Sequence, residues 1–215
     1  LDQNTIPDGG VYVIGLPGYT SPDRTRPWVA YAPKVDPKNF YGSVDDYDDV
    51  KADMVTVRIE HDFSPAMKLQ NTSRYGKTSQ DYLLTAFLTS GANLATPVQA
   101  DPSTWTLARS IRTGKDQENK ILTNVTTLTS QFNTGTVSHT LVTGLEITSE
   151  RQTTWGLTGL GTLPPANIYR PNPSDAPTTP VAVRRTGAYN EGGVDTQSVY
   201  GFDTGQVGER WIFNG

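Results

Sequence analysis

The sequence lacks cysteine and long apolar runs, and it contains only two histidines. Without cysteine the chain forms no disulfide and offers no thiolate ligand to a metal. No stretch reaches the roughly 18 consecutive apolar residues of a transmembrane helix, which excludes that kind of segment. Hydrophobic residues make up 35% of the 215 residues, a low share for a globular core of this size.

A basic surface is missing as well. The net charge is −4 and the pI is near 5.1, so no excess of lysine and arginine is available to neutralise nucleic-acid phosphates. The two histidines, His61 and His139, lie on segments far apart in the sequence, and no pattern joins them into a catalytic triad. We therefore expect neither a nucleic-acid partner nor an enzyme.

What the sequence does contain is alternation of apolar and polar residues in five stretches. The clearest runs from Asp53 to His61, where Val55, Val57 and Ile59 alternate with polar or charged residues. Successive side chains of a β-strand point to opposite faces. This stretch therefore predicts a strand with one apolar face and one polar face.

Two pairs of stretches predict hairpins. In the first, a loop at residues 62–66 places Ile59 opposite Leu69 and Glu60 opposite Lys68. Opposite charges that face each other across an antiparallel ladder are favourable by roughly 0.2–1 kcal/mol. A one-residue slip would move every side chain to the other face, so the match indicates how the two strands pair.

The second hairpin is more regular. A turn at residues 133–136 sets Phe132 against Val137 and Leu128 against Leu141. A third, partial hairpin is expected from a strand at 196–204 that turns at 205–208 into Trp211-Ile212-Phe213. Consecutive hairpins of this kind predict an antiparallel meander.

Three segments lack strand periodicity, namely residues 1–52, roughly 87–118 and 150–195. Connections this long are uncommon in compact domains and are usually functional or disordered. All three fall on one side of the meander and the tight turns fall on the other, which is the rhythm of a β-barrel that crosses a bilayer. The predicted fold class is therefore all-β: an antiparallel meander forming part of a large transmembrane β-barrel with long extracellular loops.

Aromatic residues gather where the expected strands meet loops or turns, and girdles of this kind mark the two interfaces of a membrane barrel. Three polar residues, Asn71, Asn124 and His139, fall on the face assigned to lipid, where an unpaired polar group is costly. The aromatic residues in question are Tyr75, Tyr82, Phe87, Trp105, Trp155, Tyr200, Trp211 and Phe213.

Two groups of charged residues stand out on the loop side. The acidic cluster Asp45, Asp46, Asp48 and Asp49 has the carboxylate density of a Ca²⁺ site but lacks the glycine and final glutamate of a calcium loop, so a solvated loop is the alternative. A basic and aromatic group would draw an anionic ligand into a wide mouth, unless its members are merely solvated. That group comprises Arg74, Lys77, Tyr82, Arg109, Arg112 and Lys115.

Several runs, taken together and in order, resemble TonB-dependent siderophore receptors, and in particular the Fiu-type catecholate receptors of Gram-negative outer membranes. As a set they extend over nearly the whole chain and are specific, whereas each alone is weak. The runs are residues 5–10, 14–19, 39–42, 58–62, 71–75, 80–82, 120–124, 141–146 and 200–204.

The resemblance implies a barrel of the plugged, roughly 22-stranded class. Residues 1–215 would be a partial barrel segment of about five strands and three long loops. The plug domain and the remaining barrel would be absent from this chain, which opens on Leu1 without a signal segment and stops inside an expected strand. The implied location is the outer membrane of a Gram-negative bacterium, in contact with lipid and lipopolysaccharide.

The implied function is the import of a ferric catecholate siderophore, with energy from the TonB complex acting through the plug. No cofactor and no protein metal ligand are expected, because the catecholates already saturate Fe³⁺. The complex is anionic and carries aromatic rings, so cationic and aromatic side chains suit it. The predicted ligand-binding residues are Arg74, Lys77, Tyr82, Trp105, Arg109 and Arg112.

Two other classes compete with this interpretation. A soluble β-sandwich binding module, such as an adhesin or a carbohydrate-binding domain, would also use alternating strands, but it predicts tight loops at both ends. A β-sandwich glycosidase would need a carboxylate pair drawn from Glu60, Glu146 or a loop aspartate. Nothing in the spacing of these residues indicates such a pair.

Overall fold

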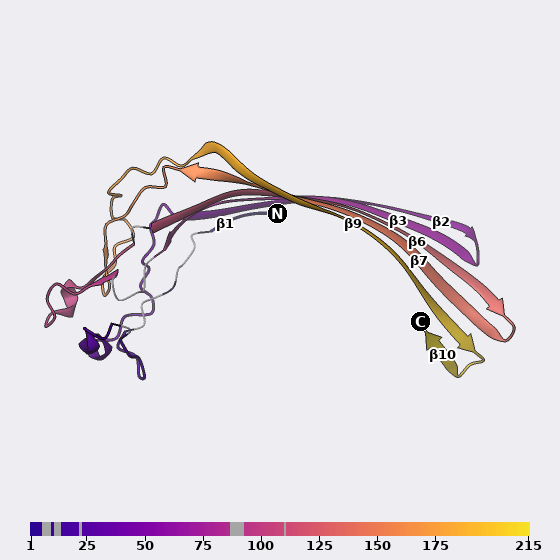
Figure 1. The fold of residues 1–215 in the computed structure, drawn as a ribbon, viewed down its shortest axis with the longest axis horizontal. Coiled ribbons are helices and arrows are strands. Elements are labelled where there is room, and N and C mark those ends of the chain that lie inside the picture. Colours follow the sequence, from indigo (N-terminus) through magenta and orange to yellow (C-terminus); the bar gives the residue numbers. More distant parts are fainter. Residues whose placement is uncertain (6–9, 11–13, 22, 87–92, 110) are drawn as a thin grey trace.

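The computed structural model describes residues 1–5, 10, 14–21, 23–86, 93–109 and 111–215 (Figure 1). Its main element is a seven-stranded sheet in the order β1-β2-β3-β6-β7-β9-β10. Every neighbouring pair is antiparallel, so the predicted meander is confirmed. The strands are β1 (Asp2–Thr5), β2 (Tyr47–Ser64), β3 (Met67–Ala86), β6 (Ile111–Thr134), β7 (Val137–Thr158), β9 (Arg184–Val207) and β10 (Trp211–Asn214).

A second, small sheet has the order β4-β5-β8 and consists of β4 (Leu94–Ala95), β5 (Thr106–Leu107) and β8 (Ala166–Asn167). The 3₁₀-helix η1 (Pro27–Tyr31) lies in the connection between β1 and β2, and η3 (Pro102–Thr104) lies in the connection between β3 and β6. A β-sandwich needs two large packed sheets, and in the described part of the chain the second sheet has only these short strands. The sandwich alternative is therefore wrong. No helix among the described residues is long and apolar enough to cross a membrane.

The connections alternate in length as the sequence predicts. The turns after β2, β6 and β9 occupy only residues 65–66, 135–136 and 208–210, and they lie at one end of the sheet. The long connections between β1 and β2, β3 and β6, and β7 and β9 all lie at the other end (Figure 1). Gly135 has a φ of +62°, which a two-residue hairpin turn requires and glycine adopts without strain.

The predicted register of both hairpins is wrong by two residues. Ile59 pairs with Asn71 and not with Leu69, and Phe132 pairs with His139 and not with Val137. The cause is that each turn lies later in the chain than expected, at residues 65–66 and 135–136, and moving the centre of a turn by one residue shifts the register by two. In the first hairpin the irregularity between Asp62 and Ser64 also contributes. Because side chains repeat every second residue, this shift leaves every side chain on its predicted face.

The strands are also longer than predicted, since they extend into all three segments that lack periodicity. β2 starts at Tyr47, β6 at Ile111 and β9 at Arg184, and β9 also runs through Gly205 and Gln206, where a turn is predicted. Beyond the apolar stretches both faces carry polar residues, so the alternation disappears. The backbone ladder needs no apolar side chains and continues.

The two faces of the main sheet differ in polarity. We call the face with Val55 and Ile59 the outer face and the face with Thr56 and Arg58 the inner face. A few apolar residues, such as Met54, also lie on the inner face. Large apolar side chains exposed on the outer face are Val55, Val57, Ile59, Phe63, Tyr75, Leu122, Phe132, Leu145, Ile147 and Val199.

The polar residues of the outer face are paired with one another. The amide of Asn71 donates to Oδ1 of Asn124 (3.1 Å), and the amide of Asn124 donates back to Oδ1 of Asn71 (3.2 Å) and to the Ser73 hydroxyl (2.7 Å). Nδ1 of His139 lies 2.7 Å from Oδ2 of Asp203. These contacts remove most of the cost of placing polar groups on an apolar face.

The aromatic prediction fits the residues on the outer face and does not fit those on the inner face or in the connections. Trp211 and Phe213 pair with the outer-face residues Val207 and Gly205, so they lie where an interfacial girdle requires. Tyr75 and Trp155 also lie on the outer face, Tyr82 and Tyr200 lie on the inner face, and Trp105 is in a long connection. Phe87 lies outside the described residues.

Candidate functional site

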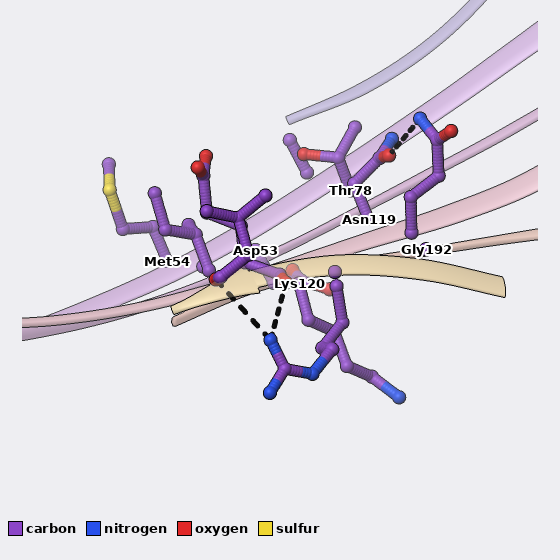
Figure 2. A pocket seen from close by; sticks show the side chains of 14 residues that line it. Asp53, Met54, Thr78, Asn119, Lys120 and Gly192 are labelled. Atoms are coloured by element: carbon purple, nitrogen blue, oxygen red, sulfur yellow. Dashed lines mark hydrogen bonds between the residues drawn. The ribbon is translucent and has the colours of Figure 1, made fainter. Parts of the chain in front are cut away.

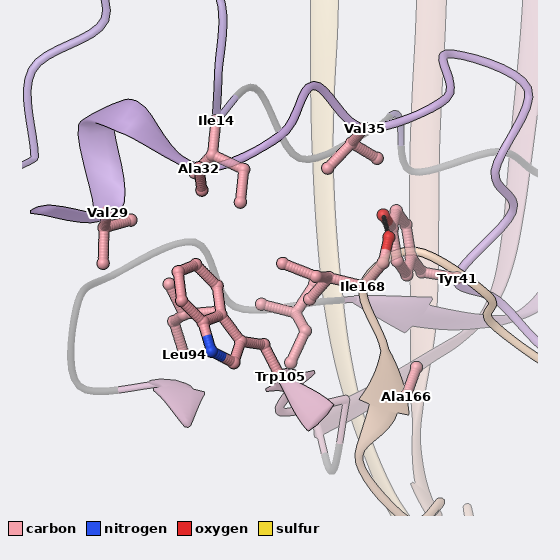
Figure 3. Packing of buried hydrophobic residues seen from close by; sticks show 10 residues of the cluster. Ile14, Val29, Ala32, Val35, Tyr41, Leu94, Trp105, Ala166 and Ile168 are labelled. Carbon is pink, nitrogen blue, oxygen red and sulfur yellow. Dashed lines mark hydrogen bonds between the residues drawn. The ribbon is translucent and has the colours of Figure 1, made fainter. Parts of the chain in front are cut away.

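The three long connections pack into one body, which we call the loop cap. Apart from Leu83 at the end of β3, every buried hydrophobic residue of the described chain lies in these connections. Figure 3 shows how side chains from all three meet in a single cluster. Its buried members are Ile14, Val29, Ala32, Val35, Tyr41, Leu94, Trp105, Leu107, Ala166 and Ile168.

Trp105 is central to this cluster. Its side chain is almost fully buried, at 1% exposure, and its indole N–H donates to the carbonyl of Val98 (2.9 Å). The ring meets Trp28 edge-on, with centroids 5.2 Å apart, a geometry that aromatic pairs favour. One edge of Trp105 borders a hollow of about 370 Å³ beside Trp28 and Tyr31. The residue therefore shapes the loop cap from within.

Arg109 joins all three connections of the loop cap. Its guanidinium donates to the carbonyls of Gly42 (3.2 Å), Pro164 (2.8 Å) and Asn172 (3.3 Å) and forms an ion pair with Asp175. The side chain is fully buried, and this burial lowers the pKa of Arg109, which Asp175 partly offsets. With these donors engaged, the side chain is a structural link and is not presented at the surface.

Arg112 forms a second link of this kind. Nη2 lies 2.6 Å from Oδ1 of Asp46, and Nη1 donates to the carbonyl of Leu160 (3.1 Å). The Asp46 carboxylate also accepts from the backbone N–H groups of Ser43 (3.0 Å) and Thr85 (3.1 Å). Both charged side chains are buried, at 0% and 1% exposure. A buried ion pair with this many partners ties the foot of the loop cap to β3 and β6.

The acidic cluster is divided by this arrangement. Asp46 is buried, Asp48 accepts from the side chain of Gln80 (3.0 Å), and Asp49 accepts from Asn4, whereas Asp45 is exposed. Among the described residues, no group of three or more histidine or carboxylate side chains could hold a metal ion. The cluster is therefore a set of separate contacts at the loop end of the sheet.

The remaining predicted site residues lie on the strands. Arg74 is on the inner face, as predicted, and donates to the Thr56 hydroxyl (3.2 Å). Tyr82 lies on the same face near the loop cap, directly opposite Lys115 of β6. Lys77 is on the outer face and pairs with Glu118 (2.7 Å). The six predicted residues therefore fall into three groups: inner face, outer face and loop cap.

A hollow of about 590 Å³ opens on the inner face (Figure 2). Its lining residues on β3, Gly76 and Thr78, lie between Arg74 and Tyr82 along the strand. The hollow crosses β2, β3, β6, β7 and β9, and its floor includes Gly76 and Gly192. A Cβ at Gly192 would meet nothing within 4 Å, so the missing side chain leaves open space. At the rim, the amide of Gln152 donates to Oδ1 of Asn119 (2.9 Å).

Sequence reasoning missed the residues around this hollow. Many of them are small or neutral, although Asp53, Lys120, Glu150 and Arg151 are charged. They come together only because five strands pair in one register. The period-two pattern would have found them: Gly76 follows Arg74 by two residues on β3, and so lies on the same face. The partners of the buried arginines carry no comparable signal, because Asp46 is 66 residues from Arg112 in the sequence.

An antiparallel sheet with an unpaired apolar face, short turns at one end and packed loops at the other defines a β-barrel receptor segment. The family model of TonB dependent receptor-like β-barrels matches residues 2–215. The chain belongs to this family.

The similar proteins are siderophore receptors. The chain is 43% identical over 215 residues to the catecholate siderophore receptor Fiu of Escherichia coli K12, covering all of this chain and 28% of that protein. The relative from Escherichia coli O6:H1 gives the same identity and coverage. The chain thus spans a little over a quarter of the length of these curated relatives.

Solved structures agree with this assignment. The open crystal form of the ferric-catecholate import receptor Fiu from E. coli K12 matches with a TM-score of 0.88 and 42% identity, covering 99% of this chain and 32% of that one. The siderophore receptor PiuA from Acinetobacter baumannii matches with a TM-score of 0.68 at 19% identity, over 99% of this chain and 30% of that one. The second match shows a shared fold.

Proposed function

We propose that this chain is part of an outer-membrane receptor of a Gram-negative bacterium that imports ferric catecholate siderophores with energy from the TonB complex. The observation that carries the proposal is the 43% identity to Fiu across the entire chain. The receptor performs transport and no covalent chemistry. The plug domain and the other barrel strands lie outside this segment.

The inner face is the part of this chain best placed to contact the ligand. On β3, Arg74 lies two residues from Gly76 of the hollow and Tyr82 lies four residues from Thr78, and Lys115 pairs directly with Tyr82. Neither Arg74 nor Lys115 takes part in an ion pair among the described residues, so both cations keep charge for an anionic complex. Charge-assisted hydrogen bonds to catecholate oxygens and stacking on Tyr82 suit such a ligand.

The two buried arginines and Trp105 act indirectly in this proposal. Arg109 donates to carbonyls of the loop cap through Nε and Nη1, and the two Nη groups of Arg112 contact Asp46 and Leu160, so both side chains position the loops around the entrance. The loop cap would cover the inner face from the extracellular side.

The test is ferric-catecholate uptake by cells that produce the full-length receptor, with and without a functional TonB complex. Wild type should import the iron complex only when TonB is present. The pair Arg74→Gln and Lys115→Gln should weaken binding at least tenfold, because two charge-assisted contacts are lost (roughly 1.5–3 kcal/mol each). Lys51→Gln, on the outer face, removes the same kind of charge and should leave binding unchanged. TonB-independent uptake would contradict the function, and unaltered binding by the double variant would contradict the site.

A further inference from the structure

Three cations lie side by side on the outer face. Lys120 and Arg151 also belong to the residues that border the hollow, but their charged ends pair with Glu118 and Asp195, and the proposed function assigns them no ligand contact. Lys77 of β3 pairs directly with Lys120 of β6, and Lys120 pairs directly with Arg151 of β7. We call these three residues the cation row. Their side chains are 43%, 49% and 43% exposed. Figure 2 shows Lys120 projecting from the side of the sheet opposite to Thr78 and Asn119.

The cation row lies directly above the apolar part of the outer face. Tyr75 and Leu122 lie on the same face, each two residues closer to the turns than the cation of its strand. On β2 the apolar stretch runs from Val55 to Phe63. That stretch is nine residues long by the sequence, close to the 9–11 residues with which a tilted strand crosses the hydrocarbon layer. The cation row is thus at the level of the lipid headgroups.

Like charges placed directly opposite one another destabilise an antiparallel pair, so three adjacent cations require counter-charges. Glu118 lies between the two lysines, 2.7 Å from Nζ of Lys77 and 2.6 Å from Nζ of Lys120, and Asp195 lies 2.7 Å from Arg151. These carboxylates hold the cations in place. An ammonium group has three donors, so each lysine keeps donors for a further anion.

The placement of Arg151 depends on a glycine. Its guanidinium lies across β9 and donates to the carbonyl of Val194 (3.3 Å). A Cβ on Gly193 would come within 2.5 Å of the Arg151 side chain, so only glycine leaves room for it. The adjacent strand is therefore shaped to let this cation lie flat against the outer face.

The charge changes sign farther from the membrane. Four residues beyond the cation row, the same face carries Asp49, Asp81 and Asp116 as direct neighbours on β2, β3 and β6. Asp116 is paired with Arg185 (2.6 Å), whereas Asp49 and Asp81 form no ion pair among the described residues and would repel a phosphate. The free donors of the cation row would attract it, which confines an anionic headgroup to the level just above the hydrocarbon. The order of apolar residues, cations and carboxylates along the outer face matches a lipid, whose acyl chains are followed by a phosphate. A soluble anion would not require the apolar residues below the cations.

We propose that Lys77, Lys120 and Arg151 bind the phosphate of a membrane lipid headgroup on the outer wall of the barrel. The proposal rests on the outer-membrane location in the proposed function, but not on the identity of the imported ligand. The cations contribute hydrogen bonds to phosphate oxygens, and the apolar residues below contact the acyl chains.

The experiment measures lipid phosphate that remains bound to the full-length receptor purified from outer membranes. The variant K77Q/K120Q/R151Q should bind the lipid roughly 100-fold more weakly. Each of the three cations near an anionic headgroup contributes about fivefold to the affinity. The matched control R58Q/K68Q/R210Q removes three charges from the inner face and a turn, and it should retain the lipid. Equal retention by both variants, or equal loss from both, would overturn the proposal.

Two further measurements distinguish a lipid site from a fold defect and from a simple anion site. The conservative variant K77R/K120R/R151K keeps the charges and should retain lipid, whereas a fold defect in the glutamine variant would show as lost ferric-catecholate uptake. Washing with inorganic phosphate should leave the lipid bound. If free phosphate strips it completely, the row is a simple anion site and the lipid proposal is wrong. Normal uptake with lost lipid would support the lipid site independently of the transport function.

Discussion

The loop cap and the main sheet bury their apolar residues in opposite ways. Trp105 in the loop cap is 1% exposed, whereas Val199 on the outer face is 82% exposed. The loop cap encloses its own core and resembles a small globular domain. The sheet holds its strands by backbone ladders and leaves its apolar face uncovered by protein, which suits a lipid surrounding. The apolar residues of the loop cap are therefore buried against protein, whereas those of the outer face are left for a non-protein surrounding.

The ion pairs show the same contrast. Arg112 and Asp46 in the loop cap are 0% and 1% exposed, while Lys68 and Glu60 on the inner face are 45% and 36% exposed. A buried charge that loses its partner is costly, whereas an exposed pair contributes little. We therefore expect the loss of an ion-pair partner to reduce stability strongly in the loop cap and only slightly in the sheet.

The largest effect is expected for Asp46→Ala. It leaves the Arg112 guanidinium buried without its carboxylate, at a cost of about 3–5 kcal/mol. Hydrogen–deuterium exchange of the full-length receptor should show lost protection in residues 27–46 and 159–178. The matched change Glu60→Ala breaks an exposed pair and should cost under about 1 kcal/mol. Equal effects of the two variants would show that the loop cap has no separate core.

An intermediate effect is expected on the outer face. Asn71→Leu removes the amide partner of Asn124 and should destabilise the receptor by about 1–3 kcal/mol, because Asn124 loses the hydrogen bonds it exchanges with Asn71 and keeps only hydroxyl partners such as Ser73. The double variant N71L/N124L removes both amides and should be close to neutral. Urea unfolding in lipid vesicles measures both. If the single and double variants are equally unstable, the amide pair does not account for how the outer face tolerates these residues.

The smallest effect is a pH dependence at the tip of the loop cap. Hydrogen bonds from the Thr25 and Arg26 side chains lower the pKa of Asp23 from its ordinary 3.8 to about 2. Its stabilising contribution is therefore present above pH 3.8 and is lost as the pH falls through about 2. Exchange protection of residues 23–31 should fall within this window in wild type, and Asp23→Asn should remove the change. If the loss of exchange protection between these pH values is the same in the Asp23→Asn variant, another titratable group causes it.

The site was predicted less well than the fold. Alternation identified the strands and placed Arg74 on the inner face, and the meander followed from the turns. The predicted register was wrong by two residues, because each turn was placed too early in the chain. Arg109 and Arg112 were grouped with ligand-binding cations since they lie in the predicted connection at residues 87–118, but their partners Asp175 and Asp46 are distant in the sequence. The ligand-binding role of Arg74 and Tyr82 stays a prediction.

The sequence by itself determined which side chains share a face, because that depends only on the two-residue period of a strand. It also determined where the short turns lie, through residues such as Gly135. Only the tertiary structure decided which charges are buried, which are neighbours in the cation row, and where the inner face is hollow. Those properties depend on residues brought together across separate strands and loops, and no local pattern encodes such distances.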